Sequence, residues 1–432
     1  MPMRRLSILL LILAAVVGTA AQSPAPATRA FVGGRLVDVA AGRIVDNATV
    51  VVRDGRIVAA GPSDAVSVPA GATRVALNGG YVLPGLISAH VHVSDVDGLK
   101  PRAYTRENTL RQLGVFARYG ITTVWSLGGE ATPAFAVRDE QAVPALARSR
   151  LLLSGDIIVA RTAADARAQV ARVAATKPDI IKIRVDDNLG TSQKMAPEVY
   201  TAVIEEAHAR RLRVAAHVFY LADAKALLKA GADVIAHSVR DVDVDDEFIA
   251  LMKARDIPYV PTLTRELSTF VYESRPAFFD DPYFTREADP AVIAQLLEPA
   301  RQAAMRTSKS AQGYKAALPV AERNLARLSA AGVRIAMGTD AGPFPERFQG
   351  YFEQLELEMM VKAGMTPAQV LRSATVDAAR AMRLDDVGRL TPGAWADFLV
   401  LKGDPLADIR NTRTATAIYI AGNAVDQTPP KR

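Results

Sequence analysis

Short apolar runs alternate with segments of helical spacing through the middle of the chain. Eight of these runs are candidates for buried strands, because turn residues or helical patterns bound each of them. They are Leu83–His92, Ile121–Leu127, Arg150–Val159, Ile180–Val185, Arg213–Phe219, Val234–His237, Tyr259–Leu263 and Val333–Thr339. Eight apolar strands separated by helices are typical of an α/β fold with a parallel barrel, the (β/α)8 or TIM barrel. We therefore expect residues 82–387 to form such a barrel.

Both ends of the chain show a different rhythm, in which short β-like runs alternate with turn residues. In residues 31–81 the Asp54-Gly55 pair separates "TVVV" from "RIVAA", which is a strong hairpin signal. Residues 388–426 return to short strands and turns. The simplest packing joins the two terminal pieces into one small β-sandwich beside the barrel.

The N-terminal segment has the pattern of a secretory signal peptide. Residues 1–21 contain two arginines, an apolar run and small residues that suit cleavage near Ala20 or Ala21. The apolar run is short for a membrane span, although an uncleaved anchor is the alternative. Residues 22–30, "QSPAPATRA", form a Pro/Ala linker. We therefore expect a periplasmic or secreted protein with no membrane segment after signal cleavage.

The composition narrows the chemistry that the chain can perform. Of its 432 residues, 50% are hydrophobic and 23% are charged, which is enough for a large packed core. The net charge of +6 comes without a Lys/Arg block or a basic-aromatic stripe, so we expect no nucleic-acid partner. The absence of cysteine excludes disulfides, thiolate zinc sites and a cysteine nucleophile. Any transition metal must therefore be held by histidine, by carboxylates or by a less ordinary ligand.

Four of the five histidines lie at the ends of predicted strands. His90 and His92 are two residues apart, so their side chains point to one face of the first strand. His217 ends the fifth strand region and His237 the sixth, and active sites of such barrels lie at this end of the strands. Taken singly, each could be a hydrogen-bonded core residue. The fifth, His208, lies among charged residues of a predicted helix and is best interpreted as a surface residue.

Two further polar residues stand at corresponding places. Lys182 interrupts the apolar run "DIIKIRVD" of the fourth strand, and Asp340 follows the eighth strand in "GTDAG". A buried lysine is costly when it is charged and unpaired, so it pairs, lowers its pKa or becomes modified. Asp340 has a simpler alternative, because the same letters also suit a turn.

Together these positions resemble the amidohydrolase superfamily of metal-dependent hydrolases. Its barrel carries His-x-His on strand one, Lys or Glu on strand four, His on strands five and six, and Asp on strand eight, and all six positions are matched here. The segments "GGYVLPGLISAHVH" and "GRLTPGAWADFLVL" extend the resemblance over nearly the whole mature chain. A strand-four lysine is similar to the binuclear subtype, in which the lysine carries a carbamate derived from carbon dioxide.

The resemblance implies two divalent metal ions, most simply zinc, with manganese, iron or cobalt as substitutes. His90 and His92 would serve one metal with Asp340, while His217 and His237 would serve the other. The carbamate on Lys182 would bridge the two. A metal-activated hydroxide would then attack an acyl carbon, and Asp340 would carry the proton to the leaving nitrogen.

The reaction that the resemblance implies is hydrolysis of a C–N amide bond in a small molecule, with a dipeptide or an N-acyl amino acid as the expected substrate. The nearest branch is that of Xaa-Pro dipeptidases and imidazolonepropionase. The dipeptidase pattern is incomplete, because "SGDIIVARTAAD" and Phe219-Tyr220 replace its Gly-Gly-His element and its Tyr two residues after the strand-five histidine. The alternatives are a cyclic amide, lactone or ester hydrolase, and a secreted binding protein that has lost catalysis. A homo-oligomer is compatible with each of them.

Three residues near the strand ends are candidates for substrate binding. Arg184 lies two residues after Lys182 and should share its face, where it could bind a carboxylate. The alternative is an internal ion pair with Asp186 or Asp187. Tyr220 and Arg240 follow the strand-five and strand-six histidines closely enough to reach a ligand.

An insertion of residues 264–332 separates the seventh and eighth strands, which is long for a barrel connection. Its first part contains six aromatic residues: Phe270, Tyr272, Phe278, Phe279, Tyr283 and Phe284. They could form a lid over an apolar or aromatic substrate. The alternative is a helical excursion that buries its aromatics in a core of its own or in a subunit contact.

Overall fold

The structure of the protein is a computed structural model that describes residues 28–429. The expected signal peptide and all but the last three residues of the expected linker lie outside this range. Strand β1 (Arg29–Asp38) already begins within the segment expected to be linker. Within the described range, no helix has both the length and the apolar character needed to cross a bilayer.

Parallel strands form the wall of a barrel, as the sequence predicts. One sheet contains β10 (Arg150–Leu153), β9 (Ile121–Ser126) and β6 (Leu86–Val91) in this order. The other contains β11 (Ile181–Arg184), β12 (Val214–His217), β13 (Val234–Ala236) and β14 (Tyr259–Val260). A bridge between Ile158 and Ile183 joins the two sheets on one side. All pairs within the two sheets are parallel, and nearly every strand residue is buried because helices cover the outside.

The eighth strand is less regular than expected. Residues 333–341 close the ring through single bridges, from Ile335 to Tyr259 and from Ala341 to Val91, and form no continuous ladder. The Ala89 amide still donates to the Met337 carbonyl at 2.7 Å. At Gly338 the chain passes so close to strand β6 that an added Cβ would lie 2.8 Å from the backbone nitrogen of His90. This close approach brings the residues after the eighth strand against the His90–His92 segment.

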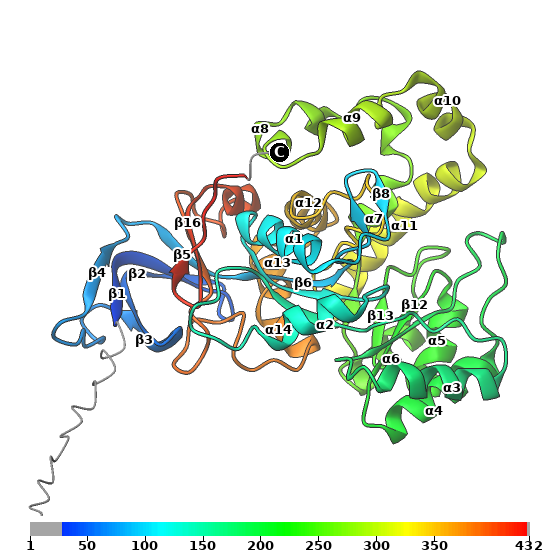
Figure 1. Cartoon of the computed structure of the whole chain (residues 1–432), viewed down its shortest axis with the longest axis horizontal. Helices are drawn as coiled ribbons and strands as arrows, with labels where there is room; N and C mark the ends of the chain where they lie inside the picture. Colours follow the sequence, from blue (N-terminus) through cyan, green and yellow to red (C-terminus); the bar gives the residue numbers. More distant parts are fainter. Residues whose placement is uncertain (1–27, 430–432) are drawn as a thin grey trace, which may run out of the picture.

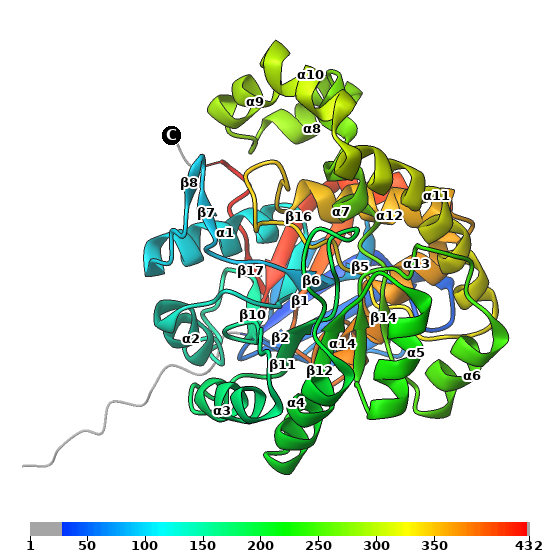
Figure 2. The same cartoon turned by 90° about the vertical axis from the view of Figure 1, so that its right-hand side faces the viewer.

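Helices surround the strands on the outside of the barrel (Figure 2). They are α1 (Arg106–Arg118), α2 (Thr132–Asp139), α3 (Ala163–Ala174), α4 (Pro197–Ala209), α5 (Leu221–Ala230), α6 (Asp246–Ala254), α12 (Tyr351–Lys362), α13 (Pro367–Ser373) and α14 (Val376–Ala381). Their buried faces and the strands share one continuous apolar core. The chemistry is thus placed on a rigid scaffold, with its functional residues at the ends of the strands.

A further sheet, separate from the two sheets of the barrel, contains strands from both ends of the chain (Figure 1). Its order is β17 (Asn423–Ala424), β16 (Ala415–Ile420), β15 (Phe398–Leu401), β5 (Tyr81–Pro84), β1, β2 (Arg43–Arg53) and β3 (Arg56–Pro62), with β4 (Thr73–Ala76) beside β1. The antiparallel pair β15 and β5 joins the C-terminal piece to the N-terminal one. Asp54 and Gly55, with φ angles of 52° and 75°, form the turn of the β2–β3 hairpin. A separate apolar cluster that includes Phe31, Val50 and Phe398 forms the core of this small domain.

The insertion forms a helical lobe that projects from the barrel in both views (Figures 1 and 2). Its elements are α7 (Leu263–Ser268), η1 (Val271–Glu273), η2 (Ala277–Asp280), α8 (Pro282–Thr285), α9 (Pro290–Leu296), α10 (Pro299–Thr307) and α11 (Lys309–Ala330). Phe279 and Phe284 stack with their ring centroids 5.3 Å apart, and Phe284 also meets Phe348 at 4.8 Å. The aromatic residues thus pack on one another and on the segment that leads into α12, as the core alternative predicts.

Candidate metal centre and active site

One cavity of about 610 Å³ opens at the C-terminal ends of the barrel strands. The six residues that the sequence marks as candidate ligands all line it: His90, His92, Lys182, His217, His237 and Asp340. Each of these side chains is at least nine-tenths buried. The fold therefore gathers residues from five separate strand ends around a single buried space.

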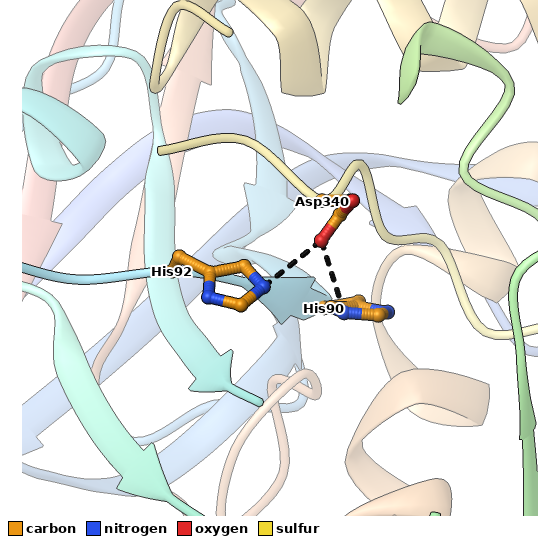
Figure 3. A group of neighbouring side chains, drawn as sticks. All are labelled: His90, His92 and Asp340. Carbon is orange, nitrogen blue, oxygen red and sulfur yellow. Dashed lines mark ion pairs between the residues drawn. The ribbon is translucent and has the colours of Figure 1, made fainter. Parts of the chain in front are cut away.

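His90, His92 and Asp340 form the tightest group (Figure 3). Asp340 Oδ1 lies 3.3 Å from His90 Nε2 and 3.0 Å from His92 Nε2. One possible ligand atom from each residue lies within 4.8 Å of the others. Two neutral imidazoles and one carboxylate are a donor set that suits zinc and similar transition metals. This buried group could hold a metal ion.

The other two histidines lie beside this group. The ring centroid of His237 is 4.5 Å from that of His90 and 4.1 Å from that of His217. His217 Nε2 is 2.8 Å from Asp186 Oδ2, and His237 Nδ1 is 2.8 Å from Thr262 Oγ1. Each imidazole is therefore oriented by one nitrogen, which leaves its second nitrogen available to a metal, as is usual for metal-binding histidines.

Lys182 completes the set from strand β11. Its Nζ lies 3.3 Å from His90 Nε2, in a position with 2% of the residue exposed. Burial lowers the pKa of Lys182 to about 7. Carbon dioxide reacts with the neutral amine, so a lysine with a lowered pKa is a suitable carbamate former.

The protonation of the group is set by the charges around it. Burial alone would raise the pKa of Asp340, but the guanidinium of Arg347 and the neighbouring histidines hold it well below its usual range. Burial likewise opposes protonation of His92, yet the carboxylates of Asp340 and Asp95 raise its pKa to about 10. The pKa of His237 stays well below its usual value because the ring is desolvated. The carboxylate of Asp340 is therefore ionised and available as a ligand or a proton acceptor.

Three residues at the ends of consecutive strands have left-handed backbone conformations. The φ angles are 75° at His237, 51° at Thr262 and 59° at Asp340. Such angles are unfavourable for residues other than glycine and cluster at functional sites. At these positions the backbone leaves the strand direction. The turns carry two candidate ligands, His237 and Asp340, and Thr262, whose hydroxyl orients His237.

The candidate substrate residues occupy different surroundings. Arg184 lines the cavity, donates to Asn188 and lies 3.8 Å from Asp186, so it is placed both as expected and within the alternative ion pair. Tyr220 and Arg240 are not among the residues that line the cavity. The Tyr220 hydroxyl donates to Asp187 at 2.8 Å. Arg240 is fully buried and paired with a neighbouring carboxylate, so its side chain is held away from the space that a ligand would occupy.

Two acidic residues that are not among the predicted site residues, Glu353 and Glu356, lie about one turn apart on α12 and contact the segments that carry the site. Glu353 accepts from Thr339 Oγ1 at 2.5 Å, next to Asp340. Glu356 accepts from the Leu263 amide and from the amide and hydroxyl of Thr264, all at 2.7 Å. Burial raises the pKa of each carboxyl to about 7. Glu353 thus fixes the segment that carries Asp340, and Glu356 fixes the segment that carries Thr262.

Four histidines, a lysine and an aspartate thus meet at one end of a (β/α)8 barrel. Residues 81–425 match the sequence model of the amidohydrolase family. The chain therefore belongs to the amidohydrolase family. The fold is that of this superfamily, a TIM barrel with a small β-domain.

Individual relatives agree with this membership. An uncharacterized protein of Mycobacterium tuberculosis is 28% identical over 356 residues, which cover 78% of this chain and 82% of that protein. Ochratoxinase from Aspergillus niger is 28% identical over 228 residues, 52% of this chain and 39% of the enzyme. The solved structure of a protein assigned as a prolidase from Bifidobacterium longum has a TM-score of 0.78 and 26% identity, covering 95% of this chain and 97% of that chain.

Proposed function

We propose that the protein is an exported, metal-dependent amidohydrolase that cleaves the C–N amide bond of a dipeptide or an N-acyl amino acid. The observation that carries this proposal is the convergence of the six candidate ligands in one buried cavity. The likeness to a protein assigned as a prolidase and to ochratoxinase favours an amide bond within a small molecule as the bond that is cleaved.

The donor set fits two metal ions. His90, His92 and Asp340 would hold one, His217 and His237 would hold the other, and Lys182 would bridge them once its amine carries a carbamate. The buried Nδ1 of His90 has no hydrogen-bond partner within residues 28–429. A buried polar atom without a partner is typical of a site that binds a further group, such as an ion. Bound divalent cations lower the pKa of water and polarise a carbonyl group.

Asp340 is the residue that would move the proton. Its carboxylate is ionised, since its pKa lies well below the usual range, and it contacts both His90 and His92. It would accept a proton from the attacking water and deliver it to the leaving nitrogen. Arg347, which pairs with Oδ2 of the same carboxylate, holds it in place.

Two alternatives use the same residues. A cyclic amide, lactone or ester hydrolase would need the same metals and the same proton carrier. A binding protein without catalysis would not require the complete ligand set, so the presence of all six positions argues against it.

Export rests on the sequence of residues 1–21. We expect the mature protein from the source cell to begin immediately after Ala20 or Ala21, which N-terminal sequencing checks. A mature chain that starts at Met1 would contradict cleavage.

A substrate screen tests the proposal. Protein reconstituted with zinc or manganese and bicarbonate is assayed against dipeptides, N-acyl amino acids, cyclic amides, lactones and esters. We expect turnover of dipeptides or N-acyl amino acids, and loss of at least about 10³-fold in kcat in Asp340→Asn, which removes the proton carrier. Turnover confined to cyclic amides, lactones or esters would favour the first alternative, and no turnover with two bound metals would favour the binding protein.

A further inference from the structure

Three buried guanidinium groups, those of Arg240, Arg265 and Arg347, lie close together beside the cavity, and two of them line it. Arg240 Nε is 3.0 Å from Glu266 Oε1, and Arg265 binds the same carboxylate through NH1 at 2.9 Å. Arg347 pairs with Asp340 Oδ2, and Arg265 Nε lies 3.8 Å from that oxygen. Three positive charges therefore share two carboxylates. Because buried guanidinium groups are stabilised by paired anions, this arrangement favours the binding of a further anion.

The excess charge faces the cavity. Arg265 and Arg347 both line it, whereas Arg240 does not. Arg265 is 5% exposed, and its Nε makes no hydrogen bond to any residue that the structure describes. This donor, which lies 3.8 Å from Asp340 Oδ2 but makes no hydrogen bond within residues 28–429, is the place at which an anion would bind.

Both arginines are fixed in position. The guanidinium of Arg265 lies 4.7 Å from the ring centroid of Tyr314, and Glu266 holds its NH1 edge. Arg347 Nε donates to Ser268 Oγ at 3.1 Å, which ties the loop after the eighth strand to helix α7. A fixed guanidinium loses little conformational entropy on binding, and its planar edge matches a carboxylate.

The site lies close to the reacting groups. An oxygen of Asp340 is within 4 Å of both Arg265 and Arg347. In an N-acyl amino acid a single carbon separates the amide nitrogen from the carboxylate. The short reach therefore suits the α-carboxylate of the leaving amino acid, rather than a carboxylate far along a side chain.

We propose that Arg265, supported by Arg347, binds the free α-carboxylate of the substrate and makes the enzyme selective for amides of amino acids with an unblocked C-terminus. This inference rests on the proposed function, since it assigns the carboxylate to the leaving half of the cleaved amide. Arg184, which also lines the cavity, is not required for it.

Binding of two stable probes tests the inference. L-phenylalanine represents a released amino acid, and L-phenylalaninol replaces its carboxylate by an uncharged CH2OH group; neither contains an amide. Dissociation constants are measured by calorimetry for zinc-reconstituted and metal-free protein. We expect wild-type protein to bind the acid about 10- to 100-fold more tightly, the ratio that one charge-assisted hydrogen-bonded contact gives.

Three variants complete the test. Arg265→Met should reduce the preference for the acid to below about 3-fold, and Arg265→Lys, which keeps the charge, should retain part of it. Arg150→Met is the matched control, because Arg150 is equally buried but pairs with Asp397 at the start of β10. It should keep the wild-type ratio.

The outcomes separate this inference from the proposed function. Equal preference for the acid in wild type, Arg265→Met and Arg265→Lys would overturn the inference, as would the absence of acid binding to wild type at about 10 mM. Amide hydrolysis without any acid preference would contradict the inference alone. An acid preference that depends on Arg265, without hydrolysis of any amide, would contradict the proposed function alone.

Discussion

Asp186 Oδ2 lies 2.8 Å from His217 Nε2, and both groups are buried at the ends of neighbouring strands. The other oxygen of Asp186 accepts the Asn188 amide at 2.9 Å, which fixes the carboxylate itself. Contact at Nε2 leaves Nδ1 of His217 as the ligand atom. In the proposed binuclear centre Asp186 would therefore be a positioning residue for the second metal.

Replacement of Asp186 should weaken metal binding. We expect Asp186→Asn to lower the affinity for the second metal about 10- to 100-fold, the usual cost of losing such a carboxylate. Competition with a chromogenic chelator measures this affinity. The control is Asp187→Asn, because Asp187 contacts Tyr220 and the Gly190 amide rather than a histidine. Equal affinities in both variants would show that Asp186 does not position the ligand.

Lys182 is expected to join the two metals. Lys182→Ala should retain at most one metal per chain, because the carbamate on Lys182 is the group proposed to bridge the two metals, and short carboxylic acids should partly restore the second. Elemental analysis of the dialysed protein measures the content. Lys194→Ala is the control, since Lys194 binds Asp223 at 2.8 Å. Full activity in Lys182→Ala would rule out the bridging role.

The buried carboxyl of Glu356 should make stability depend on pH. Burial raises its pKa from 4.5 to about 7, so the folded chain keeps a proton that the unfolded chain has lost. The stabilising contribution is present below about pH 4.5 and falls by about 1.4 kcal/mol per pH unit as the pH rises towards 7.

Glu356→Gln tests this dependence. The variant keeps one acceptor oxygen and therefore loses the contact to one of the Leu263 and Thr264 amides at every pH, but it lacks the penalty for ionisation. The free energy of unfolding of the variant relative to wild type should therefore rise by about 3 kcal/mol between pH 4.5 and 7. Urea unfolding at both pH values provides the measurement. Parallel pH profiles of the two proteins would contradict the assigned direction.

The aromatic lobe should contribute to stability rather than to catalysis. Phe284 is fully buried and contacts Phe279, Phe348 and Tyr351. Phe284→Ala should cost about 3–5 kcal/mol of unfolding free energy and leave KM within about 3-fold of wild type at a temperature where the variant is folded. Phe344→Ala, at a half-exposed position, is the stability control. A stable Phe284→Ala protein with a strongly raised KM would instead support a lid.

The strand ends and their polar residues could be predicted from the sequence. The length of each apolar run and the change to helical spacing after it indicate where a buried strand ends. The irregular eighth strand could not, since its pairing depends on the close approach at Gly338. Side-chain direction also depends on tertiary partners. Tyr220 and Arg240 follow strand-end histidines, yet Asp187 and Glu266 hold their polar groups elsewhere.

Residues whose partners lie in distant segments of the chain are harder to predict from the sequence. Arg265 lies in helix α7 and Arg347 in the segment before α12, and no spacing relates them. Glu353 and Glu356 do carry a signal, because they interrupt the apolar helix sequence "YFEQLELEMM", where buried acids are unusual. That signal indicates a buried acid but not the loop that it holds.

We propose that the six convergent residues form a binuclear metal centre. Metal content per chain, measured by elemental analysis after reconstitution with zinc and bicarbonate followed by dialysis, tests this assignment. We expect two equivalents in wild type and a loss of metal when either His90 or His237 is replaced by Ala. No bound metal in wild type under these conditions, or equal metal content in wild type and both variants, would contradict it.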